Sequence, residues 1–103
     1  MGFALLIWDA QRNEEHLDDV WKGDKYAYAG NFFEVVCRLW TDVLHYDAWA
    51  DGRPSEYRPA NASEADAVRA ELRAWGSDEN RDLFLHVVDC VAQNVNLRLI
   101  ASC

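Results

Sequence analysis

The chain has 103 residues, with 18 Asp and Glu against 10 Lys and Arg, and its formal net charge is −8 at pH 7. A chain of this length has room for one hydrophobic core, so we expect a single domain over residues 1–103. Nucleic-acid binding needs clustered Lys and Arg, and because the sequence has no such cluster we expect no nucleic-acid partner. Half of the residues are apolar and five are tryptophan, a composition typical of a globular domain.

The N-terminal residues and the cysteines indicate the cellular compartment in which we expect the protein. Residues 1–8 are largely apolar but lack a basic leader, and Asp9 follows them, so we expect neither a signal peptide nor a membrane span. Cys37, Cys90 and Cys103 form an odd set without paired spacing, which indicates free thiols in a reducing cytoplasm.

The first half of the chain has two helix-like patterns. Apolar spacing in residues 3–21 predicts one long amphipathic helix that stops at Gly23, although residues 3–8 also fit a short strand. Asn31 is a candidate N-cap for a second helix that runs to about Tyr46. Both prolines fall in residues 51–59, which we interpret as a loop.

The second half has clearer boundaries. Ser63 is the expected N-cap of a helix that ends at Gly76, and Ser77 is expected to cap the next helix. Beyond Asn94 the pattern fits either a continued helix or a strand over residues 95–101. We therefore favour an all-α fold, a compact four- or five-helix bundle. The alternative is an α+β domain in which short N- and C-terminal strands pair.

The three histidines each have an aspartate three residues away: Asp19 for His16, Asp42 for His45 and Asp89 for His86. His86 also has Cys90 one helical turn further on. On the expected helices all three imidazoles fall on polar faces, so we predict that they point outward and form no metal site. We expect no cofactor.

No local motif for catalysis is present, and we assign no catalytic residue. Cys37 and Cys90 flank apolar stripes, and we interpret them as buried, inert thiols.

Two function classes fit these patterns. The first is a non-catalytic interaction protein that neutralises a basic protein partner, as an antidote or a nucleic-acid mimic. Its acidic residues would steer the encounter, and aromatic residues beside the proline loop would anchor the complex. The expected partner-binding residues are Glu14, Glu15, Asp18, Asp19, Tyr46, Trp49 and Tyr57.

The second class is a small-molecule-binding protein or small enzyme with an aromatic-lined pocket. The expected ligand-binding residues are Phe32, Phe33, Trp40 and Trp75. A homodimer is compatible with both classes, because a small domain with broad apolar faces gains core by pairing, and the ligand pocket would then lie at its interface.

Overall fold

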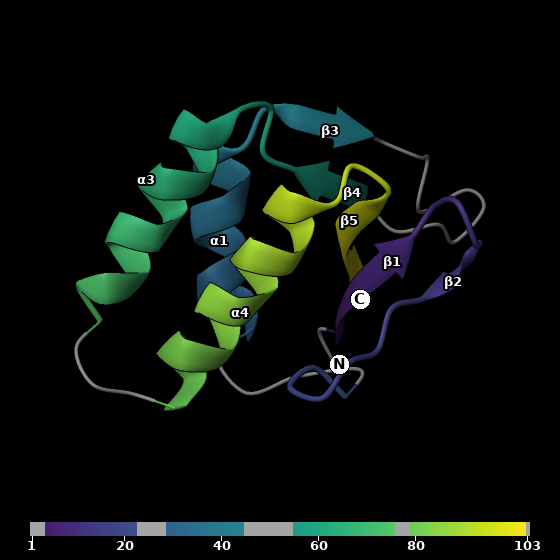
Figure 1. Ribbon diagram of the computed structural model, residues 1–103. Helices are drawn as coiled ribbons and strands as arrows, with labels where there is room; N and C mark the ends of the chain where they lie inside the picture. Colours follow the sequence, from purple (N-terminus) through teal and green to yellow (C-terminus); the bar gives the residue numbers. More distant parts are fainter. Residues whose placement is uncertain (1–3, 23–28, 45–54, 76–78, 103) are drawn as a thin grey trace.

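The all-helical bundle predicted above is wrong: the chain folds as an α+β domain in which helices pack on an antiparallel sheet (Figure 1). The computed structural model describes residues 4–22, 29–44, 55–75 and 79–102. Its strands are β1 (Ala4–Asp9), β2 (Glu14–Glu15), β3 (Asp42–Leu44), β4 (Ser55–Arg58) and β5 (Leu97–Ser102). Its helices are α1 (Ala29–Leu39), α3 (Ala62–Arg73) and α4 (Glu79–Gln93).

The sheet has the strand order β2-β1-β5-β4-β3, and every neighbouring pair is antiparallel. The longest pairing joins β1 to β5, from Ala4 opposite Ser102 to Asp9 opposite Leu97. The alternative interpretation, in which the terminal segments are paired strands, therefore describes this part of the fold.

Residues 4–9 form a strand rather than the start of a long helix. Leu5 and Ile7 are fully buried, and Leu6 and Trp8, which alternate with them, are half-buried. Because β1 has a hydrogen-bonded strand on each side and apolar residues on both faces, its sequence lacks the polar alternation of a half-exposed strand. A short apolar run of this kind cannot be distinguished from a helix turn by periodicity alone.

The second expected helix is also too long. α1 ends at Leu39, and the chain then forms β3, which pairs with β4 in the register Asp42 opposite Arg58 and Leu44 opposite Glu56. β4 lies inside residues 51–59, where we expected only a loop. These short strands form because they pair with segments that are distant in the sequence. Their own residues therefore carry little local signal for a strand.

The three described helices pack together on one side of the sheet (Figure 1). Helix α3 contacts both α1 and α4. The core between the layers includes Leu5, Ile7, Leu97 and Leu99 from the sheet and Phe32, Val36, Val68, Leu72, Phe84 and Val88 from the helices.

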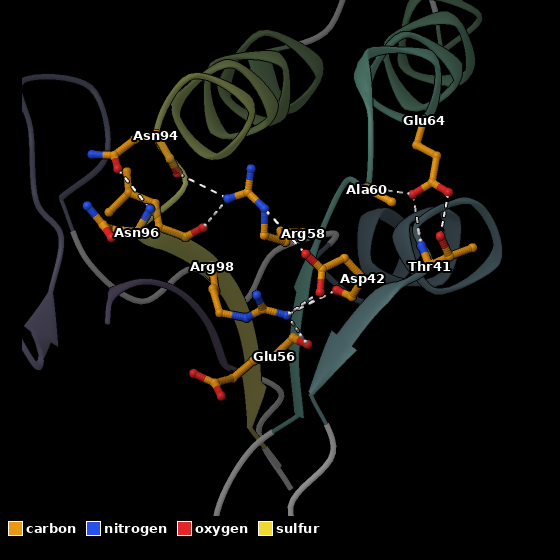
Figure 2. Close-up of polar contacts among 10 residues, drawn as sticks. Thr41, Asp42, Glu56, Arg58, Ala60, Glu64, Asn94, Asn96 and Arg98 are labelled. Carbon is orange, nitrogen blue, oxygen red and sulfur yellow. Dashed lines mark hydrogen bonds and ion pairs between the residues drawn. The ribbon is translucent and has the colours of Figure 1, made fainter. Parts of the chain in front are cut away.

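Helix α3 begins two residues earlier than an N-cap at Ser63 would place it. Its N-cap is Asn61, whose side chain accepts a hydrogen bond from the backbone N–H of Glu64 at 3.0 Å. The Glu64 carboxylate in turn accepts from the backbone N–H of Ala60 at 2.9 Å and from the Thr41 hydroxyl at 2.6 Å (Figure 2). Glu64 thus connects the start of α3 to the chain between α1 and β3.

Polar side chains connect strands β3, β4 and β5 (Figure 2). Arg98 donates to the backbone oxygen of Asp42 at 3.0 Å, and Arg58 donates to the backbone oxygens of Asn94 and Leu97 at 3.1 Å each. Because Leu97 and Leu99 face the helices, strand alternation places Arg98 on the opposite face of the sheet. There Arg98 is buried together with Glu56.

Candidate functional site

The β1–β2 hairpin shapes the first candidate site. One carboxylate oxygen of Asp9 accepts hydrogen bonds from the backbone N–H groups of Gln11 at 3.0 Å and Arg12 at 3.1 Å. Asn13 then adopts φ 55°, a left-handed conformation that asparagine tolerates better than most residues. The chain reverses, and Glu14 pairs with Asp9 at the start of β2.

An open surface pocket of about 320 Å³ lies beside this hairpin. It is lined by Asp9, Arg12, Glu14, Glu15, His16 and Leu17. Three carboxylates face one guanidinium, so the lining carries an excess of negative charge. Leu17 is 56% exposed and places apolar surface next to that charge, and Val20, three residues further along the chain, is 50% exposed.

A second site forms where residues 16–21 meet helix α4. Asp18 folds its own segment into a tight turn, since its Oδ1 atom accepts from the backbone N–H groups of Val20 at 2.8 Å and Trp21 at 2.5 Å. Trp21 is fully buried and fixes the end of the turn in the core. The second carboxylate oxygen of Asp18 is therefore directed at the helix.

Asp18 Oδ2 lies at the centre of a cluster of four side chains. It is 2.6 Å from His86 Nε2, 3.4 Å from Cys90 Sγ and 3.9 Å from His16 Nε2. Cys90 Sγ is also 3.3 Å from His86 Nε2. The histidines and the aspartate are between a quarter and a third exposed, so solvent reaches the cluster.

Two of these groups have displaced pKa values. Partial burial raises the pKa of Asp18, but hydrogen bonds from the Trp21 backbone, His86, Val20 and Cys90 outweigh this effect and hold it well below its ordinary range. Burial, followed by the hydrogen bond and negative charge of Asp18, raises the pKa of Cys90 to about 12.

This arrangement does not suit nucleophilic catalysis. A thiol with so high a pKa remains protonated near neutral pH, whereas the thiolate is the nucleophile. Asp18 Oδ2 and Cys90 Sγ also both contact Nε2 of His86. In a catalytic triad the carboxylate and the nucleophile contact different nitrogens of the histidine ring. Imidazole, carboxylate and thiol donors that converge on one point are instead ligand types for a transition metal.

The structure thus corrects the prediction that the histidines point outward. His16 and His86 both approach Asp18, which neither was expected to meet, while His45 lies outside the described residues. The spacing of His86 and Cys90 on one helix face was visible in the sequence. The contribution of residues 16–18 could not be seen in the sequence, because it depends on the turn that follows β2.

The expected partner-binding residues divide into several groups. Glu14 and Asp19 are exposed, Glu15 is half-buried in the pocket lining, and Asp18 faces α4. Tyr57 lies on β4 and packs edge-on against Phe33, with ring centroids 4.9 Å apart. It is therefore packed against the core and is not an exposed anchor. Tyr46 and Trp49 lie outside the described residues.

The expected ligand-binding aromatics belong to the core. Phe32, Phe33 and Trp40 are buried, and Trp75 packs against the core from its edge. Phe32 stacks on Phe84 with ring centroids 4.4 Å apart. These rings contact protein rather than an open pocket, and they stabilise the packing of the helices on the sheet.

Cys37 and Cys90 are free thiols, and Cys37 is exposed on α1 rather than buried as predicted. Within the described ranges, no helix has the length and apolar character needed to cross a membrane. No protein-family model matches the chain, and no curated protein or solved structure is significantly similar to it.

Proposed function

We propose that this protein binds a basic protein partner through the surface around the β1–β2 hairpin and thereby neutralises it. We call this surface the hairpin surface and define it by Glu14, Leu17, Asp19 and Val20. The observation that carries the proposal is the open acidic pocket beside exposed Leu17 and Val20.

The pocket suits a long basic side chain. A guanidinium or ammonium group would pair with the exposed carboxylate of Glu14, and its aliphatic stem would lie along Leu17. Such pockets with apolar borders are typical of the positions that dominate binding energy at interfaces.

The charge of the whole chain supports the same partner. A net charge of −8 attracts a basic protein over a distance and repels nucleic acid and anionic lipid. A basic protein surface that normally contacts nucleic acid has a charge that suits this partner role. By covering such a surface, the protein would act as an antidote or a nucleic-acid mimic. The exposed free thiol of Cys37 favours a reducing compartment, and we include a cytoplasmic location in the proposal.

The test compares two variants that remove equal charge from different faces. The immobilised wild-type chain, Glu14→Gln/Asp19→Asn and the matched control Asp66→Asn/Glu71→Gln on α3 are each used to capture partners from host extract. The captured protein is then purified, and its association and dissociation rates are measured at several salt concentrations. We expect a basic protein whose association with the hairpin variant is slower by about tenfold, with the control close to wild type.

Apolar contacts are tested separately. Leu17→Ser should mainly increase the dissociation rate of the same complex, because it removes buried contact area without changing charge. Failure to capture a basic protein, or capture that both charge variants weaken equally, contradicts the proposal.

A further inference from the structure

Three metal-ligating atoms of different chemistry lie together beside helix α4. His16 Nε2, a carboxylate oxygen of Asp18 and Cys90 Sγ are all within 4.8 Å of one another. Two of them come from residues 16–18 and the third from α4, so the group joins segments more than 70 positions apart in the chain.

The spacing is close to that of a tetrahedral metal site. Zinc–ligand bonds of about 2.0–2.3 Å place neighbouring tetrahedral ligands roughly 3.3–3.7 Å apart. Cys90 Sγ and Asp18 Oδ2 are 3.4 Å apart, and His16 Nε2 and Asp18 Oδ2 are 3.9 Å apart. The third pair, His16 and Cys90, lies within 4.8 Å, so a small approach of these side chains would bring all three atoms to one ion.

The surroundings hold the ligands in place. The turn of Asp18 uses Oδ1 for the backbone N–H groups of Val20 and Trp21, and this leaves Oδ2 for the cluster. His86 Nε2, 2.6 Å from Oδ2, fixes the carboxylate from the helix side. Outer hydrogen-bond partners of this kind orient the ligands at metal sites and are worth 10–100-fold, to order of magnitude, in metal affinity.

We propose that His16, Asp18 and Cys90 bind one Zn²⁺ ion. Imidazole nitrogen and thiolate sulfur are ligands that zinc takes readily, whereas magnesium and calcium prefer oxygen alone. On binding, the Cys90 Sγ–H bond breaks, its proton passes to solvent and the sulfur electron pair forms the bond to zinc. His86 retains its hydrogen bond to Asp18, and the fourth zinc position faces the partly exposed side of the cluster.

The ion would clamp the segment after β2 onto α4. This segment also carries Leu17 and Asp19 of the hairpin surface, but the zinc proposal is argued from the ligand geometry and does not depend on the proposed partner.

The test uses the full chain without an affinity tag, after removal of metal with a chelator. Isothermal titration with ZnCl₂ is expected to show one ion per chain with micromolar or tighter affinity. His16→Gln and Cys90→Ser should each weaken binding by about tenfold or more, since even an outer partner contributes that much. Cys37→Ser removes an exposed thiol from α1 and is the matched control, with affinity equal to wild type.

Cobalt substitution tests the ligands directly and guards against misfolded variants. Co²⁺ bound to the wild type and to Cys37→Ser should give thiolate-to-cobalt charge-transfer absorption in the near ultraviolet, and Cys90→Ser should lack it. Circular dichroism verifies that the variants are folded, and zinc should raise the melting temperature of the wild type. No zinc binding by the metal-free wild type, or unchanged affinity in folded Cys90→Ser, would overturn the proposal.

Discussion

Asn61 and Ser63 are two residues apart, and both are good N-cap residues. In the structure the N-cap is Asn61, whose side chain accepts a hydrogen bond from the backbone N–H of Glu64. We expect Asn61→Ala to lower the free energy of unfolding by about 1 kcal/mol, because the first turn of α3 loses its cap. Ser63→Ala is the matched control and should stay within about 0.5 kcal/mol of wild type. Urea unfolding measures both, and the reverse order would show that Ser63 is the cap.

Glu64 makes stability depend on pH. Partial burial raises its pKa, but hydrogen bonds from Ala60 and Thr41 outweigh this, and its pKa in the folded protein is below the ordinary value. The ionised carboxylate therefore stabilises the fold at pH values above the unfolded pKa of about 4.3, and this contribution is lost as the pH falls through the lower folded pKa.

Substitution of Glu64 should reveal this dependence. We expect Glu64→Gln to lower the free energy of unfolding by about 1 kcal/mol at pH 7, because the amide keeps the shape of the side chain but not its charge. The difference from wild type should shrink as urea unfolding is repeated at pH values below the unfolded pKa of about 4.3, and should be smallest below the lower folded pKa, where the wild-type carboxyl is neutral in both states. Exposed Glu34→Gln on α1 is the control. A difference that is equal at both pH values contradicts this account.

The residues of the side-chain cluster around Asp18 were only partly predictable. The separation of His86 and Cys90 by four positions places both on one helix face, and α4 forms where a helix was expected. Asp18 was predicted as one of the acidic partner-binding residues. Its actual role follows from the turn that it makes with Val20 and Trp21, and that turn is fixed only when Trp21 enters the core.

Phe84 of helix α4 packs against two aromatic rings of neighbouring segments. Phe84 is fully buried, stacks on Phe32 of α1 and meets Trp75 edge-on with centroids 6.2 Å apart. We expect Phe84→Ala to lower the free energy of unfolding by about 3–5 kcal/mol, because it removes both ring contacts and leaves a cavity between the helices. Val95→Ala, at a position that is 78% exposed, should change it by less than about 0.5 kcal/mol. Denaturant unfolding of both variants distinguishes the two sites, and similar losses would contradict the packing described here.

Helices were predicted more successfully than strands. α3 and α4 occur close to their expected places, because caps and apolar spacing are local signals. β1 was assigned to a helix, and β3 and β4 were missed, because their short sequences gain stability from partners far along the chain.

The oligomeric state is a property of the whole molecule, and the homodimer stays a prediction. Within the described residues, the two outer strands of the sheet are two and three residues long, which limits pairing between the edges of two molecules. A dimer would therefore form through apolar side chains such as exposed Leu44 rather than by extension of the sheet. Light scattering coupled to size-exclusion chromatography measures the mass directly, and twice the chain mass supports the dimer. If it forms, Leu44→Ser should shift it toward the chain mass, and a mass equal to one chain for the wild type rules it out.

The pairing of β1 with β5 has a consequence for biosynthesis. β1 is made early, but its longest pairing partner follows α4 and is translated last among the described strands. At about 5–20 residues per second, a ribosome needs several seconds to synthesise the intervening chain. During that interval the apolar β1 segment has no β5 to pair with, so the nascent chain should depend on chaperones that shield β1 until β5 has been translated.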